Sequence, residues 1–279
     1  MAYLHSISAL WRSWPARLAL VVLVLMALAA VFAPYLFTAD PTALNPSVRL
    51  KAPSGAHWFG TDALGRDLYS RIVYGARVSF VVGFGVLAIS VSFGVVFGLL
   101  AGYFRTLDTL IMRVMDGIMA IPGILLAIAL VAVSGSSLTT VLVAIAIPEI
   151  PRITRLVRGV ILSVCSEPYV EAALAAGTPT STILVKHMFP NTFAPLIVQG
   201  TYVFASAILL EAILSFLGAG IPPEIPSWGN IIAEGRMYFQ LIPGLVLYSG
   251  LFLSVTILSI NVLGDALRDV LDPKLQSRL

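Results

Sequence analysis

Charged side chains are scarce in this sequence. Asp, Glu, Lys and Arg make up 11% of the 279 residues, whereas a soluble protein carries about 25%. Hydrophobic residues make up 58% of the chain, and its mean hydropathy is +0.96. A water-soluble fold of this size could not bury so much apolar surface, but a lipid bilayer can accommodate it. The composition therefore predicts a membrane protein.

Cysteine and histidine are also rare, which argues against several kinds of site. The single cysteine, Cys165, excludes an intrachain disulfide, and the three histidines lack the spacing of metal ligands. No combination of nucleophile and base indicates an enzyme. The net charge of +3 would suit nucleic acid, but the basic residues lie in short loops and form no stripe. We therefore expect no catalytic residue, no metal site and no nucleic-acid partner.

Uncharged runs between charged residues predict about six membrane-spanning helices, since one span needs about 20 apolar residues. The long run between residues 116 and 149 predicts parts of two helices, one starting near Ile111 and the next running towards Arg155. The first span has an alternative interpretation as a cleavable signal peptide, but its apolar run continues to Phe37, which favours a full crossing. The other uncharged runs lie between residues 17 and 40, 77 and 105, 186 and 211, and 236 and 265. We expect an all-α, polytopic membrane protein.

The basic residues predict the orientation of these helices. With an even number of spans and the N-terminus inside, most of the 17 Lys and Arg residues lie in cytoplasmic segments. The segment 38–76 is the exception, because it is external and still carries several basic residues. Both termini are therefore expected in the cytoplasm.

Two features of the first hundred residues predict packing and domain organisation. Gly94, Gly98 and Gly102 are spaced four apart, so they share one helix face that another helix can approach closely, in this chain or in a partner. The stretch 58–76 is too polar to span the membrane. We expect it to form a short helix on the outer surface, either as an anchor or as a contact for a soluble binding protein. The predicted division is a segment 1–76, with the tail, first span and external helix, and a core of residues 77–279.

The stretch 152–190 is long and lightly charged, and it is expected to be cytoplasmic. Ser166-Glu167-Pro168 predicts a helix start, and Gly177 predicts the end of a short helix over 169–176. Its expected apolar surface consists of Tyr169, Val170, Ala173 and Leu174. Such a helix can dock into a groove on a partner or lie on the lipid surface.

Two acidic residues are expected at membrane depth. Ionisable groups there are costly and usually face a cavity or a partner, so Glu149 and Glu211 are candidates for lining a pathway. Each has an alternative. Glu149 could pair with Arg152, and Glu211 could tie two helices together.

The cytoplasmic stretch resembles the EAA loop of ABC importer permeases, whose pattern is EAA-x3-G-x9-I-x-L-P. Glu171-Ala172-Ala173, Gly177 and Pro190 match it, whereas His187 and Phe189 stand in place of the Ile and Leu. The ending His187-x-x-Pro190-Asn191 is similar to the dipeptide/oligopeptide/nickel branch. Three further segments, 59–71, 211–229 and 261–273, also resemble that branch, so the likeness covers nearly the whole chain.

The resemblance implies a type I ABC importer permease fold in the bacterial inner membrane, with this chain as the "C" type of subunit. A homologous "B"-type permease would complete the channel, two cytoplasmic ABC ATPases would bind the EAA loop (about 152–192), and a periplasmic binding protein would deliver substrate. The residues implied to couple to the ATPases are Tyr169, Val170, Glu171, Ala172, Ala173, Leu174, Gly177 and Pro190.

ATP and Mg are expected in the partner subunits, because this chain has no phosphate-binding GxxxxGK[ST] motif. No cofactor is therefore expected here. The resemblance favours peptides as substrate, with glutathione and nickel as alternatives. A secondary transporter is a rival interpretation, but the sequence shows no convincing internal repeat.

Overall fold

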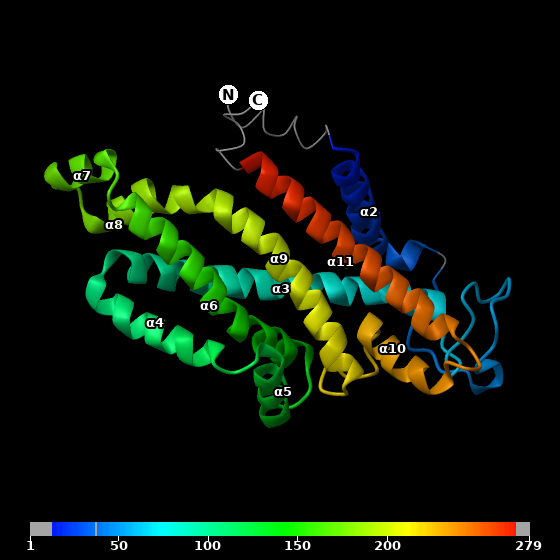
Figure 1. The fold of residues 1–279 in the computed structure, drawn as a ribbon. Coiled ribbons are helices and arrows are strands. Elements are labelled where there is room, and N and C mark those ends of the chain that lie inside the picture. The colour runs from blue at the N-terminus through cyan, green and yellow to red at the C-terminus, as the bar shows by residue number, and fades with distance from the viewer. Residues whose placement is uncertain (1–12, 37, 272–279) are drawn as a thin grey trace.

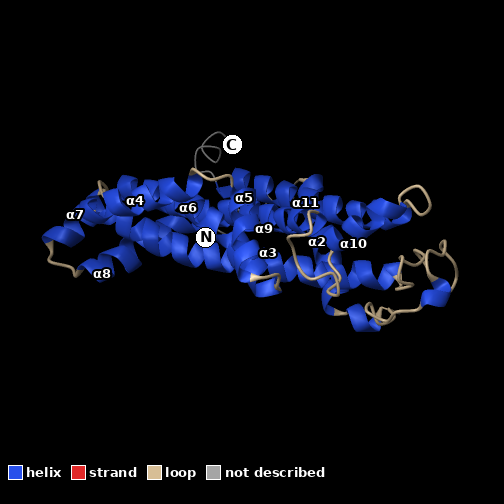
Figure 2. Ribbon diagram, turned by 90° about the horizontal axis from the view of Figure 1, so that it is seen from below, coloured by secondary structure: helices blue, strands red, loops and turns tan. Residues whose placement is uncertain are grey.

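The structure is a computed structural model that describes residues 13–36 and 38–271, and within these ranges it contains helices and no strand. Figure 1 shows an elongated bundle, with α7 and α8 at one end and α10 and the loop 38–67 at the other. Viewed from below, the longest loops again gather at the end opposite α7 (Figure 2). The helices are α2 (Trp14–Val31), α3 (Leu68–Tyr103), α4 (Arg105–Met119), α5 (Gly123–Ser134), α6 (Leu138–Val164), α7 (Pro168–Ala175), α8 (Thr180–Thr182), α9 (Phe193–Phe216), α10 (Trp228–Gly235) and α11 (Gly244–Leu271).

Short helical turns join some of these helices. The turns of 3₁₀ type are Ala33–Tyr35, Pro46–Val48, Phe189–Thr192 and Arg236–Tyr238, and Ile183–Met188 forms a π-turn. The π-turn and the turn that follows it join α8 to α9, so Thr180–Phe216 forms one continuous span.

Among the described residues, four or five helical segments are long and apolar enough to be membrane spans, against about six predicted from the sequence. In the described part of the chain, α2, α3, Thr180–Phe216 and α11 are long and apolar enough to cross a bilayer, and α4 with α5 makes a fifth candidate bent by 85°. At 27 residues, α6 measures about 40 Å and is long enough for a further span, although it is not among these candidates. Its composition alone would not mark it as a span, because it carries one Glu and three Arg residues. The helix bundle agrees with the fold class predicted from the sequence.

Three predicted boundaries are wrong. The helix expected near Ile111 begins at Arg105, and α6 continues to Val164. The external surface helix over 58–76 is not a separate element, because α3 begins at Leu68 and runs without interruption to Tyr103. Residue 76, where the sequence placed a domain boundary, lies inside α3, and the division of the chain into domains stays a prediction. Arg71, in this part of α3, is buried against Glu234 from the far end of the sequence, a partner that the local sequence does not reveal.

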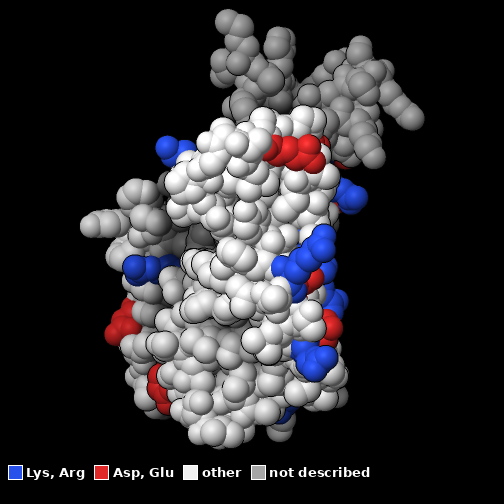
Figure 3. All heavy atoms as spheres, turned by 90° about the vertical axis from the view of Figure 1, so that its left-hand side faces the viewer, with Lys and Arg blue, Asp and Glu red and all other residues white. Residues whose placement is uncertain are grey.

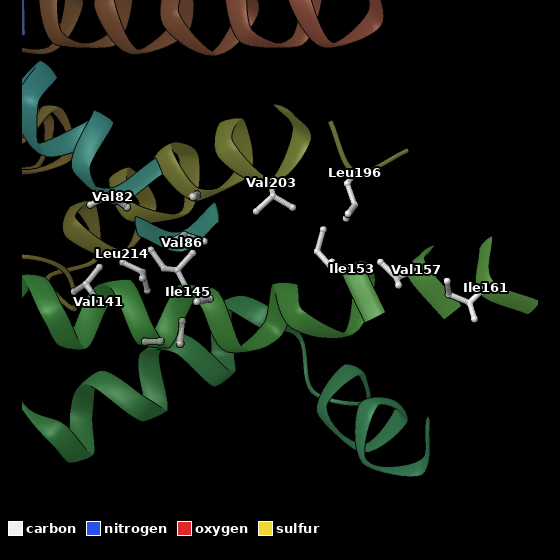
Figure 4. Packing of buried hydrophobic residues seen from close by; sticks show 14 of the residues in the cluster. Val82, Val86, Val141, Ile145, Ile153, Val157, Ile161, Leu196, Val203 and Leu214 are labelled. Atoms are coloured by element: carbon white, nitrogen blue, oxygen red, sulfur yellow. The ribbon is translucent and has the colours of Figure 1, made fainter. Parts of the chain in front are cut away.

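The main hydrophobic core lies between α3, α6 and α9. Figure 4 shows side chains from these three helices packed together, including Val86 of α3, Ile145 of α6 and Val203 of α9. A second cluster, at the end that carries α10, surrounds the fully buried Trp228. Many apolar side chains on the outside remain exposed, for example Val133 at 89%. Such a surface suits contact with lipid or with another membrane subunit.

The three glycines of α3 pack against α6. A Cβ atom on Gly98 would lie 2.5 Å from the Cβ atom of Val157, and Gly94 and Gly102 face Ile153 and Ile161 in the same way. The glycine face is thus occupied by a helix of the same chain, which is one of the two alternatives left open by the sequence. Side chains at these positions would force the two helices apart.

Candidate functional site

Helix α7 protrudes at one end of the bundle, between the end of α6 and the start of α8 (Figure 1). It begins with Pro168 in the first turn, after Glu167 as the N-cap residue. Glu167 makes no side-chain cap, and the hydroxyl of Ser166 donates to the carbonyl of Ser163 at 2.9 Å. The helix ends at Gly177, whose φ of +73° is readily adopted by glycine. Hydrogen bonds from Gly177 and Thr178 to carbonyls of the last turn complete the stop.

The two faces of α7 have different surroundings. Val170 is fully buried and belongs to the main core, and Ala173 is half-buried against it. Tyr169 and Leu174 are 44% and 47% exposed, and Glu171 is also exposed. The prediction that Val170 is part of the exposed surface is therefore wrong. An eight-residue helix needs a packing anchor, and Val170 supplies it.

A polar contact attaches α7 to the beginning of the α9 span. The hydroxyl of Tyr169 donates to the carbonyl of His187 at 3.2 Å and accepts from the side-chain amide of Asn191 at 3.0 Å. Asn191 also donates to the carbonyl of His187 at 2.7 Å. The sequence marked Asn191 only as part of a motif and gave no indication of this role. Because of these contacts, α7 is joined to α9 through side chains as well as through the chain.

The exposed face of α7 lies in a largely uncharged surface. Figure 3 views this end of the molecule directly: uncharged atoms cover most of the face, and the charged groups lie towards its edges. The exposed α7 residues other than Glu171 and Glu167 carry no charge. This arrangement suits insertion into an apolar groove with a polar rim.

A buried ion network lies at the opposite end of the molecule. Nε of Arg66 is 2.6 Å from an oxygen of Asp62, and Arg71 also pairs with Asp62. Glu234 of α10 accepts from Arg66 at 2.5 Å and from Arg71 at 2.7 Å. Burial alone would raise the pKa of Asp62, but the charges of Arg71 and Arg66 and the hydrogen bonds of Arg66 hold that pKa below its ordinary value.

This network joins the loop 38–67 to α10, and sequence reasoning missed its partner Glu234. No local signal pointed to it, because the segment 59–71 contains two arginines and two aspartates and is balanced in charge. Trp228, the first residue of α10, reinforces the junction by donating from its indole nitrogen to the carbonyl of Ile72 at 3.0 Å. The loop, the start of α3 and α10 thus form one connected unit.

Glu211 is fully buried in α9. One carboxylate oxygen accepts from the hydroxyl of Ser215 at 2.7 Å, and that hydroxyl also accepts from the backbone N–H of Ile221 at 3.3 Å. Within the described residues, its other oxygen has no hydrogen-bond partner. In this chain Glu211 connects α9 to the loop before α10 and does not face an open surface, so its role in lining a pathway stays a prediction.

Glu149 lies between Pro148 and Pro151 in α6, and its side chain is 4% exposed. Both of its carboxylate oxygens lie 3.3 Å from Nη1 of Arg152. The pairing that the sequence offered as an alternative is thus present. Arg152 itself is 54% exposed, so the pair extends from the protein interior to the surface of α6.

Two neighbouring arginines on α6 pair with carboxylates of α4. Arg155 lies 2.5 Å from Asp116, and Arg158 contacts both oxygens of Asp108 at 2.5 and 2.6 Å. These pairs hold α4 against α6. In the described ranges, no group of three or more His, Cys, Asp or Glu side chains is arranged to hold a metal ion.

Comparisons with known proteins agree with this arrangement. Residues 94–277 match the family model described as "Binding-protein-dependent transport system inner membrane component". The chain is 51% identical over 251 residues to a probable peptide ABC transporter permease protein, y4tQ, of Sinorhizobium fredii, covering 90% of this chain and 86% of the relative. It is 45% identical over 259 residues to the dipeptide transport system permease protein DppC of Alkalihalophilus pseudofirmus, covering 92% and 85%.

A solved structure supports the fold. An inward-facing conformation of the MetNI methionine ABC transporter superposes with a TM-score of 0.55 at 20% sequence identity, covering 73% of this chain and 94% of that chain. At this identity the likeness concerns the fold alone. Together with the family match and the curated relatives, it shows that the chain belongs to the family of binding-protein-dependent transport system inner membrane components, as a permease subunit of an ABC importer.

Proposed function

We propose that this chain forms one half of the channel of an ABC importer for short peptides and that α7 is its contact with a partner ATPase. The observation that carries the second part is the geometry of α7. It protrudes from the bundle, it is anchored on one face by the buried Val170, and it exposes Tyr169 and Leu174 on the other. The peptide substrate is supported by the printed names of two relatives, a probable peptide permease and a dipeptide permease.

In the proposed mechanism, ATP is hydrolysed by the partner subunits and the movement enters this chain at α7. The bonds between Tyr169, His187 and Asn191 attach α7 to the turns that lead into α9, and the short link 165–167 joins α7 to the end of α6. Because packed helices move as rigid elements, a displacement of α7 would shift both of them. Alternating access would follow from their movement relative to the second permease subunit.

The opposite end is then the external end, with both chain termini in the cytoplasm. The unit formed by the loop 38–67, the start of α3 and α10 would receive the substrate-loaded binding protein. Its ion network gives it rigidity, because Asp62, Arg66 and Arg71 are all buried and mutually paired. A rigid docking surface loses less conformational entropy on binding.

Glutathione is the second candidate substrate. The chain is 42% identical over 260 residues to the glutathione transport system permease protein GsiD of Pectobacterium atrosepticum. Uptake by the importer reconstituted in liposomes, measured for a dipeptide, a tetrapeptide, glutathione and nickel ions, separates the alternatives. Uptake of a dipeptide that requires ATP and the binding protein supports the proposal. Transport driven by an ion gradient after ATP depletion would contradict it.

The role of α7 is tested with Gly177→Val. At a φ of +73° a β-branched residue is strained, so the stop at the end of α7 should be distorted, although no atom lies within 4 Å of the new Cβ. We expect peptide uptake to fall at least tenfold while the amount of protein in the membrane is unchanged. The matched control is Gly159→Val, on the exposed side of α6, where the Cβ position is also open and the backbone is helical.

Normal uptake and normal ATPase association in the Gly177→Val variant would contradict the proposed role of α7. A second variant, Glu171→Lys, reverses a charge on the exposed face of α7 and should reduce co-purification of the ATPases. Its control is Glu224→Lys, an exposed position in the loop before α10 at the other end of the molecule. An equal loss of ATPase in both charge variants would indicate a general defect in assembly instead of a local contact.

A further inference from the structure

A break between two helices and a pair of prolines in a third, continuous helix meet at one corner of the bundle. Between α4 and α5 the chain bends by 85°, and a Cβ atom on Gly123, the first residue of α5, would lie 3.2 Å from Cβ of Pro148 in α6. Figure 1 shows α4, α5 and α6 converging there. Pro148 and Pro151 have no N–H group, so the carbonyls of Ala144 and Ile147 lose their usual helical donors.

With the start of α6 placed at the membrane surface, this corner lies near the middle of the bilayer, and the cytoplasmic stretch that the sequence predicted from residue 152 begins further along α6. Glu149 lies about 17 Å along α6 from Leu138 at the helical rise of 1.5 Å per residue, close to half of a hydrocarbon core of about 30 Å. Irregular backbone at that depth is tolerated where it is buried in protein or lines a water-filled cavity. An ionisable side chain at that depth marks a functional site more often than a purely structural one.

The pair of Glu149 and Arg152 differs from the other ion pairs of α6. Arg155 and Arg158 are held at 2.5 Å by carboxylates of α4. Arg152 pairs, among the described residues, only with Glu149 of its own helix, at 3.3 Å, and more than half of its side chain is exposed. A guanidinium has five N–H donors, and Glu149 engages one of its nitrogens. Arg152 therefore keeps donors that are free to bind an anion.

On the basis of the proposed function in peptide import, we propose that Glu149 and Arg152 form a binding site for the two charged ends of a short peptide, at the corner of α4, α5 and α6. Arg152 binds the peptide carboxylate, for which its planar guanidinium is well suited. The N-terminus of α5, at Gly123, adds a partial positive charge. Glu149 accepts hydrogen bonds from the peptide ammonium group.

The pairing at rest is consistent with this role. When no substrate is present, Glu149 and Arg152 neutralise each other, so no unpaired charge is left in the membrane interior. A zwitterionic peptide can replace both halves of the pair at once. Broken helices that direct their ends towards a charged ligand near the midplane are a recurrent way to build a transport site.

The test uses the complete importer in liposomes, with its binding protein and ATPases, and a dipeptide with free termini as the probe. Uptake and ATP hydrolysis are measured in the same sample. We expect Arg152→Gln to lower the number of peptides taken up per ATP hydrolysed about tenfold, while hydrolysis stimulated by the binding protein stays within twofold of wild type. The control is Arg155→Gln, which removes an arginine three residues away and should leave the ratio unchanged. An unchanged ratio in Arg152→Gln, or an equal loss in the control, would overturn the proposal.

A charge exchange, Glu149→Arg with Arg152→Glu, keeps the proposal testable if Arg152→Gln fails to assemble. If the pair is purely structural, the exchanged pair restores assembly and transport together. If it binds the peptide, assembly returns but the uptake per ATP remains low, because the polarity of the site is reversed. Two different results separate this inference from the proposed function. If the proposed function is wrong, the wild-type importer shows no ATP-dependent dipeptide uptake. If only this inference is wrong, the wild-type importer transports the dipeptide and Arg152→Gln leaves the uptake per ATP unchanged.

Discussion

The contact between α3 and α6 allows a quantitative prediction, because Gly98→Ala adds one methyl group where no space exists. Its Cβ would lie 2.5 Å from Cβ of Val157 and 2.9 Å from the carbonyl oxygen of Thr154. Neither of these atoms can move by rotation of a side chain. The two helices must therefore separate by about 1 Å to reach ordinary contact distances, which loosens the contacts of the flanking glycines as well.

We expect a net loss of about 2 kcal/mol in stability. Overpacking of a close-packed interior costs about 1–3 kcal/mol, and the intrinsic preference for Ala over Gly in a helix, up to about 1 kcal/mol, offsets part of that cost. Lipid tails are as apolar as the side chains of the helices, so burying other apolar surface does not compensate for the lost contact. Helix association in a membrane depends on close packing. For a chain of this size the loss corresponds to a fall of about 4–8 °C in the midpoint of thermal denaturation.

The assay is the loss of monodisperse protein on size exclusion after heating in detergent, at a fixed heating time because unfolding is irreversible. Gly85→Ala is the matched control in the same helix: its Cβ would meet only the end of the Leu142 side chain, at 2.8 Å, which can rotate away. At Gly117 no atom lies within 4 Å of an added Cβ, so Gly117→Ala measures only the preference for Ala over Gly in a helix. Equal midpoints for the Gly98 and Gly85 variants would refute the reasoning.

Three further predictions concern other contacts. Asp62→Asn removes a buried charge from between two arginines and should destabilise the protein by about 3 kcal/mol. Because folding lowers the pKa of Asp62, its contribution is complete above the ordinary carboxylate range near 4 and is lost as the pH falls through the folded pKa. The difference in denaturation midpoint between wild type and Asp62→Asn should therefore shrink in acid, and a constant difference would contradict this. Trp228→Phe removes one of the hydrogen bonds to the buried carbonyl of Ile72, which keeps its helical donor within α3, at a cost of about 1 kcal/mol in the same assay. Val170→Ala should increase proteolysis of α7, whereas Leu174→Ala, on the exposed face, should not, and equal cleavage of both would count against the two-faced packing.

Local patterns were sufficient to predict several features. The scarcity of charge predicted a helical membrane protein, because backbone groups in lipid must be satisfied within helices or closed barrels. Gly177 predicted the end of α7, since the positive φ that stops this helix is a property of one residue. The spacing of Gly94, Gly98 and Gly102 predicted a face for close packing, because residues four apart share a helix face.

The identity of the contacting groups was decided only by the tertiary structure. Val170 and Tyr169 are adjacent in sequence, yet one is buried and the other exposed, because the rotation of a short helix is set by what it packs against. Glu234 meets Arg66 and Arg71 from more than 160 residues away, and this pairing allows α3 to begin before the apolar part of its sequence. Helix formation depends on neighbours within four residues along the chain, and so can be predicted from sequence. The partners of buried charges and the inner faces of helices depend on segments brought together only when the chain folds.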